Sequence, residues 1–210
     1  MGTRERRDRE KQQLRHKILA AARELFVAKG YEAVTMREIA KAIEYSPTAI
    51  YLHFRDKKTV MDALCDEDMR ALAKRFGKVA AEPDPVERLR KAGHAYANFA
   101  LRHPHHYRWM FLEPHPPHRY EDSEVEHGNP DQDAYAFLRA AVTQAVADGR
   151  FRRELDDPDL LSQLIWSAIH GLVALLIVKH HDRWVDWRPK KRLVAEMVEL
   201  TLRGLLRDPA

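Results

Sequence analysis

Four dipeptides in which a helix-capping residue precedes proline constrain this chain most strongly. They are Ser46-Pro47, Asp84-Pro85, Asn129-Pro130 and Asp157-Pro158. The capping oxygen accepts a hydrogen bond from an unpaired N–H of the first helical turn, and proline at the next position lacks the N–H that would otherwise stay unpaired. Each dipeptide therefore predicts the start of a helix.

The residues between these starts favour helix throughout. Ala, Leu, Arg, Glu and Lys recur at helical spacing without a strand-like alternation, and the 210 residues contain 8 glycines. Thr35 and Glu38 form a capping box, and Gly30 can end the preceding helix. We therefore predict an all-α fold with a mobile loop at 113–129. The predicted helices are 10–29, 36–42, 46–54, 57–79, 85–102, 105–112, 131–148, 158–180 and 190–207.

Positive charge is concentrated at the N-terminal end. Residues 1–60 contain 14 Lys and Arg against 8 Asp and Glu, whereas residues 61–210 contain 22 against 24. A basic module on an otherwise nearly neutral protein suggests a polyanionic partner, either nucleic acid or an anionic membrane surface. We therefore divide the chain into a domain of residues 1–60 with a basic N-terminal arm and a larger domain of residues 61–210.

Cysteine usage and hydropathy favour a cytoplasmic protein. The single Cys65 excludes an intramolecular disulfide, and the N-terminus lacks the apolar core of a signal peptide. The most apolar stretch, Leu160 to Val178, is interrupted by polar residues, whereas a membrane span needs ~20 predominantly apolar residues. We expect a buried helix there and no membrane partner.

Two short predicted helices, 36–42 and 46–54, are joined by a tight turn and form a candidate helix-turn-helix. In such a motif the second helix can enter the major groove of DNA. Ordinary helical bundles also contain such pairs, but this second helix is short and polar where a core helix would be apolar. Ile50 and Phe54 anchor it inward, and the side chains expected to face outward are Ser46, Thr48, Tyr51 and His53.

This segment resembles the N-terminal domain of TetR-type regulators. The similarity covers roughly residues 10–60. It rests on Leu25-Phe26, Gly30-Tyr31, Val34-Thr35, Ile39-Ala40 and the run from Ala49 to Lys57, AIYLHFRDK. The turn Ile43-Glu44-Tyr45 has no glycine where many relatives place one, so Tyr45 is expected to be partly exposed beside the DNA.

The resemblance implies a set of DNA-binding residues. Thr48 and Ala49 are expected to read bases, because their methyl groups suit a thymine methyl. Phosphate contacts are expected from Thr35, Arg37, Ser46, Tyr51, His53 and Lys57, with Tyr45 and Pro47 beside them. Thr35 could equally be only a helix cap, and Tyr51 only a packing residue. The arm from Arg4 to Lys17 could follow the DNA or remain a solvated tail.

The C-terminal part is expected to form a homodimer through its last two helices. The 158–180 helix is apolar on more than one face, so one face suits the subunit's core and another suits a partner. The last helix adds a second apolar stripe of Leu193, Met197, Val198, Leu202 and Leu205. The segment from Trp166 to Leu172 resembles a Trp-His-Gly pattern of one TetR subgroup.

In the family this domain encloses a small-molecule pocket, which implies a small apolar or aromatic effector. The candidate lining residues are His94, Tyr96, Phe99, Tyr107, Met110, Phe111, Tyr135, Trp166 and His170. Aromatic and Met residues at helical spacing also pack as ordinary core, so each has that alternative.

Seven of the 12 histidines lie between His94 and His127. They leave a second reading open, a helical enzyme or metal-binding protein using residues 94–127. No nucleophile with its base can be identified and no metal-ligand set is defined, so we predict no catalytic residue, metal or cofactor. The favoured function is a ligand-responsive repressor that binds a palindromic operator as a dimer and is released by its effector.

Overall fold

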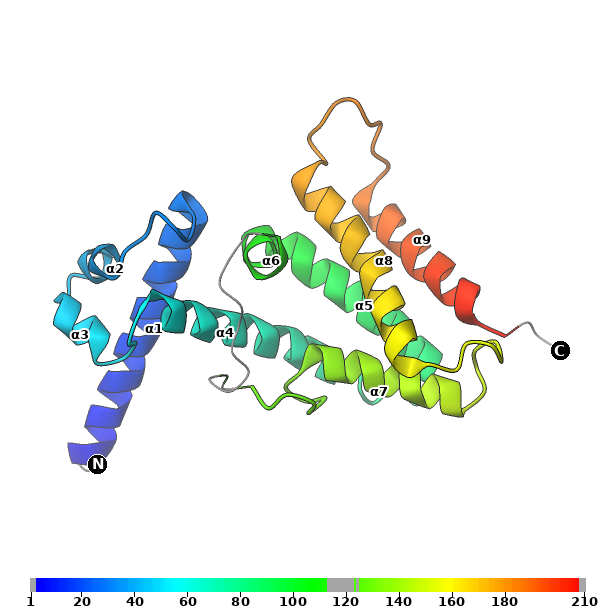
Figure 1. The fold of residues 1–210 in the computed structure, drawn as a ribbon, viewed down its shortest axis with the longest axis horizontal. Coiled ribbons are helices and arrows are strands. Elements are labelled where there is room, and N and C mark those ends of the chain that lie inside the picture. Colours follow the sequence, from blue (N-terminus) through cyan, green and yellow to red (C-terminus); the bar gives the residue numbers. More distant parts are fainter. Residues whose placement is uncertain (1–2, 113–122, 124, 208–210) are drawn as a thin grey trace. The chain divides into compact units, whose positions relative to one another are not determined.

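Helices make up the regular structure of the computed structural model, which describes residues 3–112, 123 and 125–207 (Figure 1). Apart from one isolated bridge between Phe151 and Leu206, these residues contain no strand. The helices are α1 (Thr3–Lys29), α2 (Met36–Ala42), α3 (Pro47–Tyr51), α4 (Lys57–Gly77), α5 (Pro85–Arg102), α6 (Pro104–Phe111), α7 (Ala134–Ala147), α8 (Pro158–Val178) and α9 (Lys190–Leu205). The all-α prediction is confirmed.

Three of the four predicted helix starts are confirmed. The side chains of Ser46, Asp84 and Asp157 accept first-turn N–H groups of α3, α5 and α8. The start predicted at Asn129 is wrong, because its side chain accepts the N–H two residues later at 3.0 Å and begins a turn instead. Asp133 caps α7, accepting two N–H groups at 2.8 and 3.1 Å. Of the predicted loop 113–129, residues 113–122 and 124 lie outside the described residues.

Several helices differ in length from their predicted ranges, α1 and α3 among them. Helix α1 begins at Thr3 rather than Glu10, and Arg6 donates to Glu10 at 2.9 Å across one turn of this extension. Helix α3 ends at Tyr51, and the N–H groups of His53 and Phe54 both donate to the carbonyl of Ile50, at 2.9 and 3.0 Å. His53, expected on the third helix, therefore follows it.

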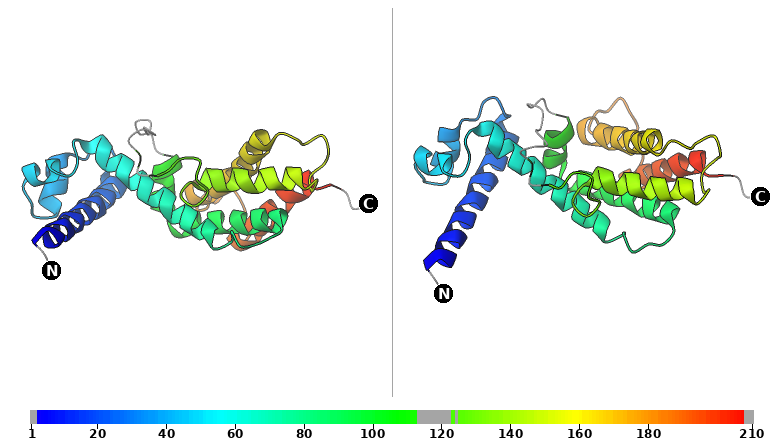
Figure 2. Two further views of the ribbon diagram at one scale, coloured as in Figure 1. Left: turned by 90° about the horizontal axis from the view of Figure 1, so that it is seen from below. Right: turned by 60° about the horizontal axis from the view of Figure 1, so that its bottom comes forward.

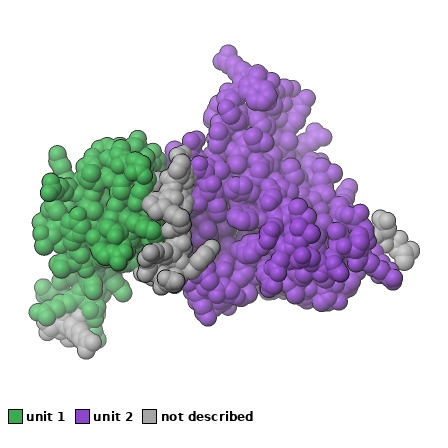
Figure 3. Space-filling view, in the orientation of Figure 1, with its two compact units in different colours: residues 1–67, 114–124 green, residues 68–113, 125–210 purple. Residues whose placement is uncertain are grey.

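The chain forms two compact units (Figure 3): residues 1–67 with 114–124, and residues 68–113 with 125–210. Helix α4 contributes its first half to one unit and its second half to the other. The functional boundary at residue 60 stays a prediction. Within the first unit, α1, α2 and α3 surround a small core that includes Ile18, Ala22, Phe26, Val34, Ile39, Ile50 and Phe54.

Helix α5 is central to the second unit, in contact with α6, α7, α8 and α9 (Figures 1 and 2). The close packing at Gly93 favours glycine. A Cβ at that position would lie 3.0 Å from Cδ1 of Ile169 and 3.1 Å from Cγ2 of Val198. Glycine thus allows α8 and α9 to pack directly on the central helix.

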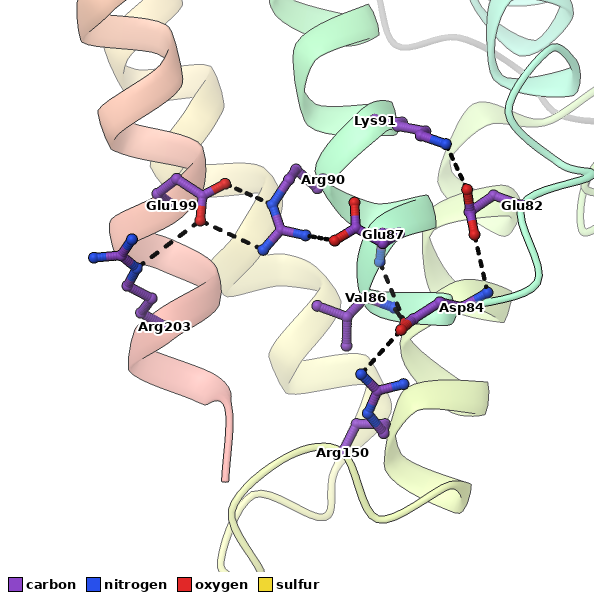
Figure 4. Close-up of polar contacts among 9 residues, drawn as sticks. All are labelled: Glu82, Asp84, Val86, Glu87, Arg90, Lys91, Arg150, Glu199 and Arg203. Carbon is purple, nitrogen blue, oxygen red and sulfur yellow. Dashed lines mark hydrogen bonds and ion pairs between the residues drawn. The ribbon is translucent and has the colours of Figure 1, made fainter. Parts of the chain in front are cut away.

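Ion pairs hold the first turns of α5 to its neighbours (Figure 4). Arg90 donates to Glu199 of α9 at 2.5 Å and also pairs with Glu87. Arg150, in the connection after α7, donates to Asp84 at 3.0 Å. These contacts hold the pKa values of Glu199 and Asp84 below their usual range. Because the groups are partly exposed, each pair contributes only about 0–1 kcal/mol.

Helix α8 buries one face and exposes another. By length and composition it could cross a membrane, a test that core helices of soluble proteins also pass. The sequence predicted a buried helix here, and the structure buries only one of its faces. The buried face consists of Leu161, Ser162, Ile165, Ile169, Val173 and Leu176. The exposed row, with a three- or four-residue period, consists of Leu160, Leu164, Ser167, Gly171, Leu175 and Val178.

The apolar stripe predicted on α9 serves mainly the subunit itself. Val198 and Leu202 are buried in the core of the second unit, and Leu193 and Leu205 pack against that core. Leu200, which the sequence analysis did not select, is the large apolar side chain that α9 exposes, at 66%. The stripe predicted for the dimer partner instead faces the core, because the side of α9 that carries Val198 packs against Gly93 of α5.

Candidate functional site

The turn between α2 and α3 holds its shape with a strained residue. Glu44 has a φ of 60°, in the left-handed region that glycine occupies freely. The N–H of Tyr45 donates to the carbonyl of Ala40 at 3.0 Å and closes the turn. A non-glycine residue in this conformation costs about 1–2 kcal/mol. The missing glycine noted in the sequence therefore falls where the backbone needs one.

Helix α3 presents polar side chains on an exposed surface. The Ser46 hydroxyl accepts the N–H of Ala49 at 3.2 Å and fixes the start of the helix. Pro47 and Thr48 are exposed, Ala49 is half-buried, and Tyr51 is 52% exposed. Ile50 is fully buried. A short helix that is anchored by one buried apolar side chain and exposes Thr48 and Tyr51 can enter a DNA groove without uncovering a core.

Leu52 was missed by the sequence analysis. It directly follows α3, and 77% of it is exposed. An apolar side chain so open to solvent, beside the polar surface of α3, is available to a thymine methyl or a sugar. Phe54, two residues later in the turn that follows α3, is buried. The turn thus leaves one of these apolar side chains exposed and buries the other.

The start of α2 has a local structural role. The Thr35 hydroxyl and the Glu38 carboxylate form the predicted capping box, with Glu38 N–H donating to Thr35 Oγ1 at 3.2 Å and Thr35 N–H to Glu38 Oε2 at 2.9 Å. Lys29 donates to the same carboxylate at 2.9 Å, and its contact is the main cause of the lowered pKa of Glu38. Arg37 and Tyr45 are exposed nearby.

Lys57 begins α4 and is already held by the first unit. Its Nζ donates to the carbonyl oxygens of Tyr31 at 2.7 Å and Glu32 at 3.3 Å. It also lies 4.2 Å from the centroid of the Tyr31 ring. The lysine thus ties α4 to the turn after α1, a role that sequence reasoning did not indicate.

Basic residues of α1 lie near the end of α3. The guanidinium of Arg15 lies 4.6 Å from the centroid of the Phe54 ring. Burial lowers the pKa of His53, and the nearby charges of Lys11 and Arg15 lower it further. Arg7, Lys11 and Arg15 share one helical face, the face that continues into the buried Ile18. The expected arm is therefore a helix with a cationic row beside α3.

In the second unit, six of the nine predicted effector residues come together. Four are hydrogen-bonded: Trp166 Nε1 donates to Tyr96 Oη at 3.0 Å, the hydroxyls of Tyr96 and Tyr107 are 3.0 Å apart, and Tyr107 Oη lies 2.6 Å from His170 Nδ1. Tyr96 Oη is also 3.1 Å from that nitrogen. Helices α5, α6 and α8 supply these groups.

Aromatic rings surround this group. Phe111 lies 5.4 Å from the His170 ring and 6.0 Å from Trp166, and Tyr135 lies 6.0 Å from Trp166, all between centroids. Trp166 and Tyr135 are each 36% exposed, whereas Tyr107 is fully buried. Burial is the first cause of the lowered pKa of His170 and of the raised pKa of Tyr107. The aromatic cluster, defined as Tyr96, Tyr107, Phe111, Tyr135, Trp166 and His170, thus combines a polar centre with partly open rings.

The other three predicted effector residues have different surroundings. His94 is exposed and lies close enough to Glu199 to lower the pKa of that carboxyl. Phe99 is buried against His103, at 5.4 Å between ring centroids, with Arg75 over its ring at 5.5 Å. Met110 is buried in the core of the second unit.

Histidines of the region 94–127 form no metal site within the described residues. No group of three or more His, Cys, Asp or Glu side chains there could hold an ion. His106 pairs instead with Asp68 at 3.2 Å. His115 and His118 lie outside the described residues.

Two family models match this chain. Residues 18–64 match the model of bacterial regulatory proteins of the tetR family. Residues 89–201, more than half of the chain, match the model of a Tetracyclin repressor-like C-terminal domain. The Trp-His-Gly subgroup is not named by either model and stays a prediction.

Individual proteins are similar along most of the chain. The HTH-type transcriptional repressor AcnR of Corynebacterium glutamicum is 36% identical over 191 residues, which are 90% of this chain and 92% of that protein. A match to the AcnR of Corynebacterium diphtheriae is limited to 46% of this chain and 44% of that protein, at 35% identity. The solved structure of the TetR family transcriptional regulator PfmR from Thermus thermophilus has a TM-score of 0.64 at 26% identity, covering 90% of this chain and 96% of PfmR.

Proposed function

Because the chain belongs to the tetR family of bacterial regulatory proteins, we propose that it represses transcription by binding a palindromic operator as a homodimer and leaves the operator when a small effector binds. The chain is a DNA-binding transcriptional regulator with a helix-turn-helix, not an enzyme. The observation that carries the finer proposal is the exposed polar surface of α3, set in a basic unit and anchored by Ile50.

On this proposal, α3 lies in the major groove with Thr48 and Ala49 as base readers. Ser46 and Tyr51 hold phosphates on either side, and Tyr45 and Pro47 border the groove. Hydroxyl groups and helix N-terminal N–H groups suit phosphate oxygens, and such contacts fix the register of the protein on the duplex. The exposed Leu52 adds an apolar contact.

A second set of groups follows the DNA backbone. Thr35 and Arg37 approach it from α2, His53 from the turn after α3, and Lys57 from α4. The α1 row of Arg7, Lys11 and Arg15 extends this cationic surface beyond the helix-turn-helix. Since each phosphate neutralised by Lys or Arg releases counterions, these contacts raise affinity for every sequence alike.

The homodimer is proposed to form through the exposed row of α8, with α9 beside it. Leu160, Leu164, Leu175 and Val178 supply apolar area. Ser167 and Gly171, at the middle of the row, allow two helices to approach closely, and nothing within 4 Å would meet a Cβ at Gly171. A second copy of the same row is complementary to it about a two-fold axis.

The effector is proposed to bind at the aromatic cluster, among Tyr107, Phe111, Trp166 and His170. Helix α4 then couples this site to the DNA, because the continuous helix carries Lys57 in one unit and Phe76 in the core of the other. Half-sites repeat about every 34–36 Å along B-DNA, so a change of a few ångströms in the separation of the two α3 helices removes contacts on both sides.

A gel-shift assay tests this function. The probe is the duplex next to the protein's own reading frame, compared with the same duplex after one half-site is scrambled. Because two-fold protein symmetry requires two half-sites, scrambling one should weaken binding sharply at physiological salt. Equal affinity for both duplexes would contradict the proposal.

A further inference from the structure

We infer that the Trp166–Tyr96–Tyr107 hydrogen bonds hold His170 as a neutral ring with its proton on Nε2, so that the effector is an apolar or aromatic molecule that presents a carbonyl oxygen to this N–H. The inference names the ligand class of the proposed effector site and rests on that proposal.

The donors of the cluster are all satisfied when Nδ1 is an acceptor. Trp166 Nε1 is a donor only, so Tyr96 Oη accepts from it. One tyrosine hydroxyl then donates to the other, at 3.0 Å, and that other donates to His170 Nδ1, which lies 2.6 Å from Tyr107 Oη and 3.1 Å from Tyr96 Oη. Every hydroxyl hydrogen has an acceptor, provided that Nδ1 carries no proton.

The opposite tautomer leaves the buried group unsatisfied. If Nδ1 carried a proton, it would donate to a tyrosine oxygen, and the two hydroxyl hydrogens would share one remaining acceptor. One of them, on Tyr96 or Tyr107, would then have no partner in the cluster, although both side chains are buried. Burying an unpaired hydroxyl is unfavourable. The short contact to Tyr107 therefore fixes Nδ1 as the acceptor.

The neutral form agrees with the surroundings of the ring. Burial lowers the pKa of His170, and burial raises the pKa of Tyr107, so that neither group is charged at neutral pH. A carbonyl oxygen matches the neutral N–H donor that this assignment leaves on Nε2.

The Nε2–H group is the polar group of the cluster left for a ligand. Among the described residues, the hydrogen bonds of the His170 ring are made at Nδ1. The ring also lies edge-to-face against Phe111, at 5.4 Å, and Trp166, at 5.8 Å, between centroids. These rings and the partly exposed Tyr135 offer flat apolar faces to the rest of the ligand. The ligand class follows from one donor surrounded by aromatic carbon.

Nitrogen NMR of the full-length protein tests the tautomer directly. Long-range proton–nitrogen correlations, assigned with His170→Gln, should show His170 with an unprotonated Nδ1 and a protonated Nε2. Tyr96→Phe combined with Tyr107→Phe removes both hydroxyls within reach of Nδ1 and should convert the ring to a mixture of tautomers, while Tyr135→Phe, a matched change outside the hydrogen bonds, should leave it unchanged. A proton on Nδ1 in the unaltered protein overturns the inference.

Three probes of the same skeleton test the ligand class: acetylnaphthalene, ethylnaphthalene and naphthylethylamine. Tryptophan fluorescence should show the ketone bound at least about tenfold more tightly than the ethyl compound, which lacks the carbonyl acceptor, and than the amine, since a buried cation without a partner is disfavoured. His170→Phe should remove the preference for the ketone over the ethyl compound. A panel without preference for the ketone overturns the ligand class. If the protein prefers the ketone but DNA binding is unchanged by it, the inferred ligand class stands and the proposed effector function is wrong. If the amine alone releases the DNA, the effector function stands and the inferred ligand class is wrong.

Discussion

The DNA-binding surface and the aromatic cluster are built in different ways. In the first unit, the candidate residues lie within a few positions of one another, on short helices whose caps and turns are local, and most side chains are exposed. In the second unit, the cluster joins α5, α6, α7 and α8, and its polar centre is buried. The same residue type therefore has different surroundings: Tyr51 is exposed to solvent in the first unit, whereas Tyr107 is buried in a hydrogen-bonded group in the second.

The largest effect is expected from the interface that places two copies of the first unit on one operator. The double change Leu164→Glu and Leu175→Glu puts charge in the middle of the exposed α8 row. The protein should become monomeric in analytical ultracentrifugation, and operator affinity should fall by more than about 100-fold, since one half-site remains. Val27→Glu, at another exposed apolar residue, is the control. A double variant that remains dimeric would show that this row is not the interface.

The next effect concerns the cationic row of α1. Arg7→Ala with Lys11→Ala should weaken binding to all duplexes by roughly tenfold or more and should reduce the slope of log affinity against log salt by about 2, because two phosphate contacts are lost. Arg6→Ala with Lys17→Ala removes the same charge from a different face of α1 and should change both quantities less. Identical results for the two pairs would mean that only net charge matters, not the position of the row.

The same substitution in both regions sharpens the comparison. Tyr107→Phe removes the short hydrogen bond to His170 Nδ1, leaves that nitrogen only the longer contact with Tyr96 Oη, and should lower the free energy of unfolding by about 1 kcal/mol. Tyr51→Phe, at an exposed residue, should change stability by less than about 0.5 kcal/mol but should weaken DNA binding. Urea denaturation and gel shifts measure the two. If Tyr51→Phe were the more destabilising, its outward role would be wrong.

The smallest effect is expected at the strained turn. Glu44→Gly should stabilise the first unit by about 1 kcal/mol, because glycine adopts a φ of 60° without the cost of a side chain. Glu44→Ala keeps the strain and removes the same charge, so it should raise DNA affinity as much as Glu44→Gly does without the gain in stability. Equal melting temperatures for the two variants would remove strain as the explanation.

The sequence predicted best what depends on local chemistry. The capping box at Thr35, the cap at Ser46 and the inward Ile50 are all determined by residues within one turn, and all are confirmed. Asn129 misled because an Asn side chain caps a turn as well as it caps a helix, and Asp133 lies close behind it. Helical propensity alone did not indicate that α1 continues to Thr3.

Long-range contacts were predictable only in part. Aromatic residue type suggested the cluster, but it could not separate Tyr96 from Phe99, three residues away on α5, because the difference is which neighbouring helix each one meets. Likewise, the sequence identifies Lys57 only as a positively charged residue. Its hydrogen bonds to the Tyr31 and Glu32 carbonyls form only when the turn after α1 is folded. Which face of α9 is exposed depends on the contact between Val198 and Gly93 of α5, and the spacing of apolar residues along α9 does not reveal that contact.

The central claim, that the two regions are coupled, is tested by measuring the affinity of an effector with and without saturating operator. A thermal-shift screen supplies the effector, since a ligand of the folded state raises the melting temperature. Calorimetric titration should then show effector affinity falling on addition of operator by the same factor by which effector weakens DNA binding, about 5–150-fold for a coupling of ~1–3 kcal/mol. Trp166→Ala should weaken effector binding with operator binding largely retained. Effector affinity that is indifferent to saturating operator would contradict the coupling and leave a DNA-binding protein that does not respond to its ligand.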